Sequence, residues 1–225
     1  MKKKYKLWTH LPYPKNISPP DKFVAKQINS WPLFYLKNIR NAQLAVLIKS
    51  PNNISWDQEL IKLKEILKKS SKEKQHLRVI DDLSTIFEWL TLLSYLSISN
   101  NLGVNGIKRL ITTILLTIHD VAVTTWVLKF KYNVARPVQL DKKLINLIPT
   151  PLNPSYPSGH ASIAGALSAV LGDFFPKEAA LINKLAIRTA KGRVYAGVHF
   201  PIDIEEGLVL GHTLGLQIIK KVKGN

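Results

Sequence analysis

Hydrophobic side chains recur every three or four residues along most of the chain after residue 20, which predicts helices rather than strands. Ser55 and the acidic residues Asp57 and Glu59 mark one helix start, because a serine cap and an acidic first turn stabilise a helix N-terminus. Further patterns of helical spacing cover residues 81–99, 106–135, 158–175, 176–195 and 201–221. The sequence shows no internal repeat and no convincing alternation of polar and apolar positions. We therefore predict an all-α fold, a helical bundle.

Two features organise the predicted bundle. Residues 1–20 are rich in proline and show no periodicity, which predicts an extended N-terminal arm followed by a single domain over residues 21–225. The pattern at residues 106–135 is apolar nearly all round, so we place that helix at the centre of the fold. We expect Pro137 to end it, because proline cannot continue a helix.

Composition narrows the class of protein. The chain has 225 residues, of which 46% are hydrophobic and 21% charged, values that exclude a disordered tail. It has no cysteine, which excludes a disulfide framework, an iron–sulfur cluster and a thiolate zinc site. No window holds 18 uninterrupted apolar residues, and no apolar segment follows the basic N-terminus. We therefore predict neither a transmembrane helix nor a signal peptide, and expect a cytoplasmic protein, at most peripheral to a membrane.

The basic charge indicates an anionic partner. Lysine and arginine number 32 and aspartate and glutamate 15, so the formal net charge is 32 − 15 = +17. A phosphorylated small molecule, an acidic membrane surface and nucleic acid all carry the complementary charge. The sequence contains no recognisable nucleic-acid-binding motif, which disfavours the last of these. The lysines between residues 62 and 74 are also typical of a solvated helix face.

Residues that can carry chemistry gather in three clusters of the second half. Lys129 and Arg136 are seven residues apart, which predicts one helix face, and Trp126 lies one turn before Lys129 as a candidate pocket wall. The run from Ser155 to His160 opens a helix, where unpaired backbone N–H groups attract anions.

The third cluster contains Arg193, His199 and Asp203. The histidine and the aspartate are four residues apart at a helix start, close enough for the carboxylate to orient the imidazole. The three clusters together supply permanent cations, a helix N-terminus, two histidines and a carboxylate. This set of groups suits phosphoryl transfer without a divalent metal. The dipeptide His119-Asp120 is typical of metal phosphohydrolases, but no further residues of such a site are evident.

At these residues the sequence resembles the type 2 phosphatidic acid phosphatase (PAP2) and vanadium haloperoxidase superfamily. The family pattern is lysine, six residues, Arg-Pro; then Pro-Ser-Gly-His; then Ser-Arg, five residues, histidine, three residues, aspartate. The matching positions are Lys129, Arg136, Pro137, Pro157, Ser158, Gly159, His160, Arg193, His199 and Asp203. Ten fixed positions in order, over a third of the chain, make a specific signal.

The resemblance implies a role for each matching residue and the all-α bundle of this superfamily. His199 would be the nucleophile that forms a phosphohistidine, Asp203 would hold its tautomer, and His160 would be the general acid. The phosphate oxygens would be held by Lys129, Arg136, Ser158, the N–H of Gly159 and Arg193. A phosphatase of this kind would need no metal and no cofactor. In the haloperoxidase branch, vanadate would instead bind at His199.

Three functions stay open. We favour a phosphatase for a phosphomonoester or a lipid or isoprenoid phosphate, because haloperoxidases are usually much longer. A vanadium-dependent haloperoxidase is the first alternative, since the residues around Trp126 resemble that branch. A non-catalytic basic binding protein with a degenerate site is the second, because Gly192 replaces the serine of the family pattern. The sequence leaves the oligomeric state, including a homo-oligomer, open.

Overall fold

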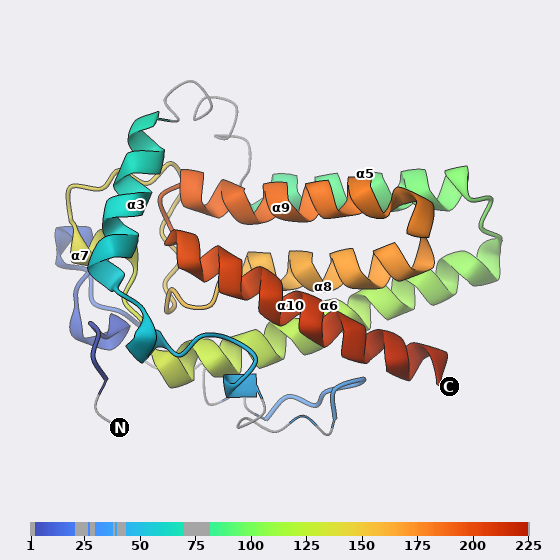
Figure 1. Ribbon diagram of the computed structural model, residues 1–225, viewed down its shortest axis with the longest axis horizontal. Helices are drawn as coiled ribbons and strands as arrows, with labels where there is room; N and C mark the ends of the chain where they lie inside the picture. The colour runs from blue at the N-terminus through green and yellow to red at the C-terminus, as the bar shows by residue number, and fades with distance from the viewer. Residues whose placement is uncertain are drawn as a thin grey trace.

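The protein is a bundle of helices, seen in a computed structural model that describes residues 3–20, 27, 30–37, 39, 44–69 and 82–224 (Figure 1). The helices are α3 (Trp56–Lys69), α5 (Asp82–Ser99), α6 (Val104–Tyr132), α7 (Pro137–Leu140), α8 (Gly159–Phe174), α9 (Ala179–Tyr195) and α10 (Pro201–Lys223). Four short 3-10 turns accompany them at Trp8–His10, Pro14–Asn16, Pro51–Asn53 and Pro176–Glu178. No strand occurs within these described ranges, so the predicted all-α class is confirmed.

Helix α8 is the centre of the bundle. It packs most extensively against α10, then against α9 and α6, while α5 lies along α9 (Figure 1). The prediction that residues 106–135 form the central helix is therefore only partly right. Helix α6 does border the core, but its first half is an outer helix with exposed side chains such as Val104 and Leu115.

Three glycines allow α8 and α10 to approach closely. Gly207, Gly211 and Gly215 follow one another at every fourth position of α10, so they share one face of that helix. A Cβ at Gly211 would meet the carbonyl oxygen of Ser162 in α8 at 1.8 Å, and a Cβ at Gly215 would meet the carbonyl oxygen of Ala166 at 2.9 Å. The two helices therefore pack backbone against backbone, with no room for a larger side chain between them.

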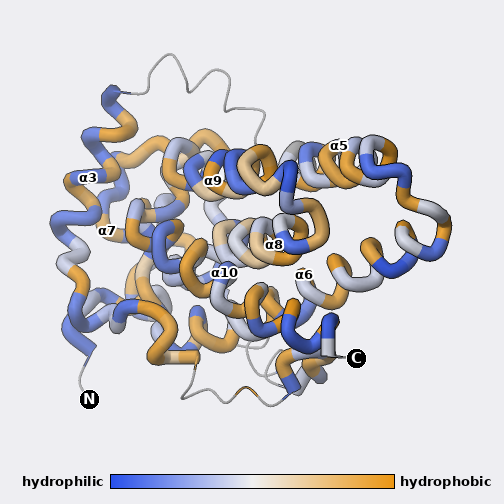
Figure 2. Tube along the Cα trace, turned by 45° about the vertical axis from the view of Figure 1, so that its right-hand side comes forward, coloured by the Kyte–Doolittle hydropathy of each residue, from blue (hydrophilic) through white to orange (hydrophobic). Residues whose placement is uncertain are grey.

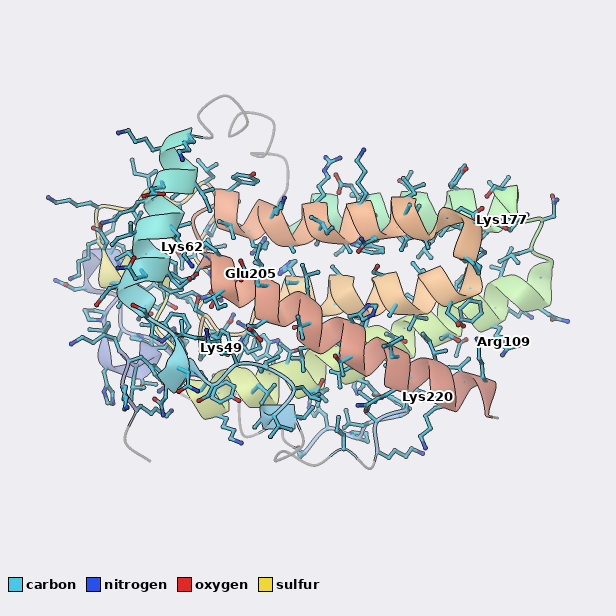
Figure 3. The ribbon with its side chains drawn as sticks, in the orientation of Figure 1. Lys49, Lys62, Arg109, Lys177, Glu205 and Lys220 are labelled. Carbon is cyan, nitrogen blue, oxygen red and sulfur yellow. The ribbon has the colours of Figure 1, made fainter. Side chains whose placement is uncertain are left out.

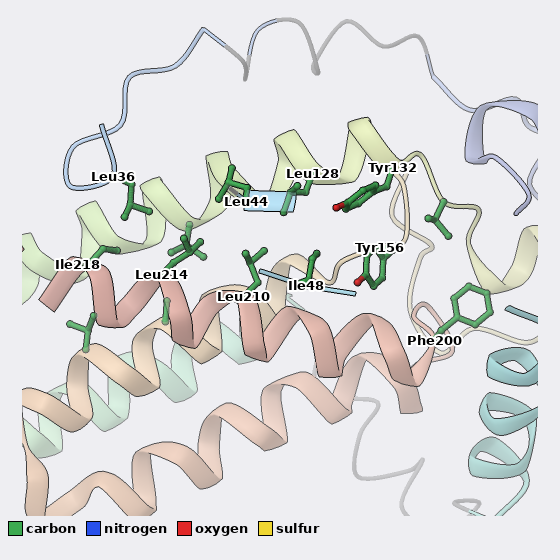
Figure 4. Packing of buried hydrophobic residues seen from close by; sticks show 14 of the residues in the cluster. Leu36, Leu44, Ile48, Leu128, Tyr132, Tyr156, Phe200, Leu210, Leu214 and Ile218 are labelled. Atoms are coloured by element: carbon green, nitrogen blue, oxygen red, sulfur yellow. The ribbon is translucent and has the colours of Figure 1, made fainter. Parts of the chain in front are cut away.

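The largest hydrophobic cluster fills the space between α6, α10 and the residues Leu36, Leu44 and Ile48. Leu210, Leu214 and Ile218 of α10 face Leu128 and Tyr132 of α6 in Figure 4. This cluster fixes the C-terminal half of α6, which carries Lys129, against the middle and the C-terminal half of α10.

Helix α3 closes one end of the bundle. Its buried residues Leu63 and Leu67 pack against Ala161 at the start of α8, Val194 at the end of α9 and Ile204 at the start of α10. Apolar positions at this spacing, after an acidic first turn, explain why residues 56–69 form an amphipathic helix. Three helix termini therefore meet under α3.

The end of α6 differs from the prediction. The helix stops at Tyr132 rather than at Pro137, because Asn133 adopts the left-handed conformation (φ 59°) and donates its backbone N–H to the carbonyl of Lys129. Asparagine tolerates this conformation better than most residues and commonly ends helices. The chain then leaves the helix axis before Arg136.

The N-terminal arm lies along this exit. Leu7 forms an isolated antiparallel bridge with Val134, and the backbone N–H of Trp8 donates to the carbonyl of Asn133 at 2.8 Å. The side-chain amide of Gln139 donates to the carbonyls of Trp8 and Leu11. The arm thus supports the segment that leads to Arg136. The predicted boundary at residue 21 lies outside the described residues.

The prediction that no transmembrane helix is evident is wrong for the part of the chain that the structure describes. Helix α6 has 29 residues and a window of mean hydropathy 1.6, long and apolar enough to cross a membrane, with half of that window buried inside the protein. The search for an uninterrupted apolar run missed it, because His119, Asp120 and several threonines interrupt the run without making the helix polar.

Candidate functional site

The predicted site residues meet at the end of the bundle that α3 closes. Lys129 comes from the last turn of α6, Ser158 from the start of α8 and Arg193 from the last turn of α9. His199 directly precedes α10, and Asp203 belongs to its first turn. Side chains that are up to 74 positions apart (203 − 129) in sequence therefore share one location.

Lys129 is held by the loop before α8. Its ammonium donates to the carbonyls of Pro154 (2.6 Å) and Ser155 (2.9 Å), and the residue is almost fully buried. A Cβ at Gly159 would lie 3.9 Å from Cε of Lys129, which places the N-terminus of α8 beside the lysine side chain. The lysine and the helix N-terminus thus present positive charge to the same space.

Arg136 reaches the same space from another element than predicted. It is the N-cap of α7 and does not share a helix face with Lys129, because α6 has already ended. Its guanidinium donates to the carbonyl and side-chain oxygens of Asn153 (both 2.8 Å) and to the carbonyl of Val198 (2.8 Å). It also lies 3.0 Å from Nε2 of His199.

The start of α8 supplies the neutral donors. Ser158 caps the helix: its Oγ accepts from the N–H of Ala161 (3.4 Å), which leaves the hydroxyl proton able to donate elsewhere. The backbone N–H of Ser158 donates to the carbonyl of Asp203 at 2.9 Å and so joins the starts of α8 and α10. His160 follows two residues after Ser158 and is half-buried. Ser158 therefore contacts the third cluster directly.

Asp203 orients His199. Nδ1 of His199 lies 2.8 Å from Oδ2 of Asp203, and both residues are buried. The same carboxylate oxygen accepts from the hydroxyl of Ser155 (2.6 Å) and from the backbone N–H of Phe200 (3.0 Å). The other oxygen, Oδ1, has no hydrogen-bond partner among the described residues. The contact predicted from the spacing of four residues is present.

Burial and the cations set the charge of the imidazole. Burial, followed by the fields of Arg136, Lys129 and Arg193, lowers the pKa of His199 well below its ordinary value. Burial raises the pKa of Asp203 to about 6, against the opposing effects of the Ser155 hydrogen bond and of Lys129. At neutral pH the pair is therefore a neutral imidazole beside a carboxylate, and the contact is a hydrogen bond rather than an ion pair.

These contacts assign the tautomer. Nδ1 carries the proton, because its neighbour is a carboxylate oxygen that can only accept. Nε2 then carries the lone pair, which accepts from the guanidinium of Arg136. The lone pair of Nε2 thus points toward the guanidinium of Arg136.

The buried cations lower one another's pKa values. Burial, with the nearby Arg193, lowers the pKa of Arg136 to about 10, and burial followed by the field of Arg136 lowers the pKa of Lys129 well below its usual range. The positive charge of Arg193 contributes to lowering the pKa of both Lys129 and Arg136. A bound dianion would supply the missing negative charge and favour the protonated forms of all three.

Trp126, the predicted pocket wall, is half-buried on α6 and lies one turn before Lys129. Its ring packs against Phe130 with a centroid distance of 5.6 Å, and Phe130 packs edge-on against Trp8 of the arm. These contacts fix the ring beside the lysine. Its use as a wall for substrate stays a prediction.

Sequence reasoning missed three residues that hold the site together. Asn153 holds the guanidinium of Arg136, and Ser155 holds the carboxylate of Asp203 while its carbonyl holds Lys129. Glu59, buried on α3, accepts from the backbone N–H of Ile202 (2.9 Å) and so satisfies the N-terminus of α10. Only Ser155 carried a signal, since it opens the run that ends at His160.

Gly192, the departure from the family pattern, is buried on α9 next to Arg193. Within the described residues, no group of three or more histidines, aspartates and glutamates is placed to hold a metal ion. His76 and the lysines at positions 72 and 74 lie outside the described residues.

The basic residues of the surface are dispersed rather than gathered at the site. Figure 3 shows Lys62 on α3, Arg109 on α6, Lys177 before α9 and Lys220 on α10, spread from one end of the molecule to the other. Several are paired, such as Lys64 with Asp141 (2.5 Å) and Lys223 with Asp173 (2.7 Å). The positive charge of the site therefore comes from the buried Lys129, Arg136 and Arg193.

Comparison with known proteins gives three findings. The family model of the PAP2 superfamily matches residues 107–225. A vanadium-dependent bromoperoxidase of Ascophyllum nodosum is 32% identical over 31% of this chain and 18% of its own length. An undecaprenyl-diphosphatase of Sulfolobus acidocaldarius is 36% identical over 34% of this chain and 37% of its own. The chain thus matches well under half the length of either relative.

A solved structure has the same fold. A bacterial vanadium-dependent iodoperoxidase superposes with a TM-score of 0.75 over 98% of this chain and 62% of its own, at 22% sequence identity. This likeness confirms the predicted helical architecture of the superfamily and shows the fold alone.

The predicted cytoplasmic location is contradicted. The undecaprenyl-diphosphatase is named for a long isoprenoid diphosphate, a lipid, and lipids are constituents of membranes. Helix α6 is in addition long and apolar enough to cross a membrane. The expectation had rested on the lack of an uninterrupted apolar run, which is too strict a criterion for a helix that also packs against protein.

Proposed function

Because the chain belongs to the PAP2 superfamily, we propose that it is a phosphatase that hydrolyses a phosphate ester, with His199 as the nucleophile. The observation that carries the proposal is the neutral His199, which is oriented by Asp203 and has its Nε2 lone pair at the guanidinium of Arg136. A phosphate group bound by the buried cations would meet this lone pair directly.

The first step would be transfer of the phosphoryl group to the imidazole. Nε2 of His199 forms a bond to phosphorus while the bond between phosphorus and the ester oxygen breaks. Lys129, Arg136 and Arg193, with the hydroxyl of Ser158 and the N–H of Gly159, bind the three phosphoryl oxygens. Asp203 stabilises the positive charge that develops on the imidazole, through the hydrogen bond from Nδ1.

His160 would act on the leaving group. It donates a proton to the departing ester oxygen, so that an alcohol and not an alkoxide leaves. It then accepts a proton from the water that attacks phosphorus. The bond between phosphorus and Nε2 breaks, inorganic phosphate forms and neutral His199 is restored.

We propose a lipid or isoprenoid phosphate as the substrate class, with simple phosphomonoesters as poorer substrates. The name of the Sulfolobus relative supports this class. Contact with an anionic membrane surface through the excess basic charge, and a homo-oligomeric state, stay predictions. Binding of nucleic acid is not proposed.

The same pocket suits vanadate. A lone pair on Nε2 of His199 and three buried cations are the groups that a trigonal oxyanion requires. His199 would hold vanadate at Nε2, and Lys129, Arg136 and Arg193 would bind its oxygens. The bound group would supply peroxide activation in a haloperoxidase, and this is the second candidate function, favoured by the bromoperoxidase relative.

The deciding experiment is hydrolysis of p-nitrophenyl phosphate between about pH 4 and pH 9 in the presence of EDTA. We expect turnover that vanadate blocks and that His199→Ala abolishes, because vanadate mimics the transition state at the same nitrogen. His212→Ala is the matched control, since His212 is an exposed histidine of α10 outside the site. Turnover that survives in His199→Ala would contradict the proposal.

The alternatives have their own signals. Halogenation by the vanadate-loaded protein with peroxide and bromide, without phosphate release from any ester, would establish the haloperoxidase. Anion binding that falls steeply with salt and is indifferent to His160 and His199 would establish the non-catalytic binding protein.

A further inference from the structure

One side of the first half of α6 carries exposed apolar side chains, while Asn105, Arg109 and Thr112 are exposed on the adjacent side. Val104, Ile111 and Leu115 are each about half exposed or more, with exposed fractions of 69%, 49% and 60%. The outer face of a helix in a water-soluble bundle is ordinarily polar. In Figure 2, hydrophobic and hydrophilic segments alternate along α5 and α6, as expected when apolar residues occupy one side of a helix.

This outward side ends at the candidate site. At 100° per residue, one sector of roughly 60° on α6 contains the positions Val104, Lys108, Ile111, Leu115, Ala122, Trp126 and Lys129. We call this set the α6 outer face. Its last member, Lys129, is the lysine that lies beside the N-terminus of α8.

Exposure decreases along the α6 outer face toward the site. Leu115 is exposed, Ala122 and Trp126 are half-buried, and Lys129 is buried. The α6 outer face is therefore exposed to solvent at Val104 and becomes buried at Lys129, where the phosphate would bind. A surface that served only to contact a second copy of the chain would not need to lead inward to a cationic pocket.

Packed elements border this face on both sides. On one side, Leu110 and Ile114 of α6 pack with residues of α8. On the other side lies the segment of residues 31–36, where the half-exposed rings of Trp31 and Phe34 pack against His119 at centroid distances of 6.2 and 5.1 Å. Aromatic rings and aliphatic side chains thus line a strip that runs to the phosphate pocket.

We propose that the α6 outer face binds the hydrocarbon chain of the substrate while its phosphate group occupies the pocket at Lys129. This inference rests on the proposed phosphatase function and specifies a long-chain phosphate ester as the substrate. The distance from Lys129 to Ile111 along the helix axis is roughly 27 Å at 1.5 Å per residue. Only a long chain gains from the whole face, so turnover should rise with chain length.

The test compares a long-chain substrate with a chainless one. Phosphate release is measured from hexadecyl phosphate, dispersed in neutral detergent, and from p-nitrophenyl phosphate. The ratio of the two kcat/KM values is expected to fall at least tenfold in Leu115→Lys, because removing two methylene contacts already accounts for about that factor. Leu216→Lys, at a half-exposed leucine of α10, is the control and should leave the ratio unchanged.

A binding measurement makes the test independent of turnover. In a His199→Ala background, 16-bromohexadecyl phosphate should quench tryptophan fluorescence, since Trp31 lies near the brominated end of the bound chain. Leu115→Lys should raise the concentration for half-maximal quenching about tenfold, and Leu216→Lys should not. Trp31→Phe should remove most of the quenching, because Trp31 packs on His119, well along α6 from Lys129 and near the brominated end of the chain.

The outcomes separate the two proposals. An unchanged ratio and unchanged quenching in Leu115→Lys would overturn the assignment of the α6 outer face. A loss seen only with substrate in lipid vesicles, and not in detergent, would also overturn it, because the face would then contact the bilayer. Absence of phosphate release from both substrates would count against the phosphatase function, and the quenching would then decide the chain-binding proposal alone.

Discussion

Two buried carboxylates, Asp120 and Asp203, show how differently two regions of the molecule use the same group. Asp120 in the middle of α6 accepts from the backbone N–H groups of Phe34, Tyr35 and Leu36, at 2.7 to 2.9 Å, through both of its oxygens. Asp203 receives its three hydrogen bonds on Oδ2 alone, and two of them come from side chains. Both are completely buried.

The difference separates a structural carboxylate from a reactive one. Asp120 is saturated by fixed backbone donors and holds the segment of residues 33–36 against α6. Asp203 has one oxygen unpartnered among the described residues and is coupled to an imidazole whose charge must change during the proposed reaction. Burial alone does not identify a functional acid; the kind and arrangement of its donors do.

The largest expected effect comes from Asp203→Asn. The amide would donate to Nδ1 of His199, move the proton to Nε2 and remove the nucleophilic lone pair, so turnover should fall about a thousandfold or more. The amide would leave the buried backbone N–H of Phe200 without its acceptor, so the midpoint of thermal unfolding should also fall, as for a loss of about 1 to 3 kcal/mol, while the protein that remains folded stays inactive. Phosphate release and a circular dichroism melt measure the two quantities. Full activity in this variant would break the distinction between the two carboxylates.

Asp120→Asn should lose stability without losing activity. Its amide can satisfy fewer than three backbone donors, so the free energy of unfolding should fall by about 3 kcal/mol. Turnover of the folded fraction should stay within about threefold of the native value. Urea unfolding and kcat, corrected for the folded fraction, provide the measurement. A stable but inactive Asp120→Asn would show that this carboxylate is also part of the reaction.

Ser155→Ala sharpens the comparison by removing one donor from Asp203. The hydroxyl lowers the pKa of Asp203, so its loss raises that pKa further, and the acidic limb of the pH–rate profile should move to higher pH. Turnover below neutral pH should fall about tenfold, as for a hydrogen bond to a charged group. Ser155→Thr, which keeps the hydroxyl, should restore the limb. A uniform loss at all pH values would indicate a packing defect instead.

The smallest effects on stability and turnover are expected for substitutions of Glu59. It is a third buried carboxylate, and its Oε2 caps the N-terminus of α10 through Ile202. Glu59→Ala should lower the free energy of unfolding by about 1 kcal/mol and turnover by only about two- to threefold. Glu59→Gln retains an acceptor and should recover most of both. A loss of turnover comparable with that of Asp203→Asn would show that Glu59 also takes part in the reaction.

The sequence predicted the helices well where apolar periodicity alone defines them. Residues 158–175 and 201–221 were expected and form α8 (Gly159–Phe174) and α10 (Pro201–Lys223). The end of α6 was misplaced, because Asn133 ends the helix in a left-handed conformation before Pro137 is reached. Apolar periodicity carries no information about such a conformation.

The site was predictable as three clusters but not as a hydrogen-bonded network. The spacing of His199 and Asp203 is local and gave their contact directly. The partners Ser155 and Asp203 are 48 residues apart, and Glu59 and Ile202 are 143 apart, so only the fold reveals them. The same holds for Asp120, whose donors lie more than 80 residues earlier.

The glycines of α10 have a consequence for motion. With Gly207, Gly211 and Gly215 seated against the backbone of α8, these two helices cannot slide or rotate past one another without a collision between main-chain atoms. Their amide protons should therefore exchange with solvent only when the whole bundle opens, and together rather than helix by helix. Any widening of the pocket during a catalytic cycle then falls to the loop of residues 141–157 and the arm, while Ser158 and Asp203 keep a constant separation.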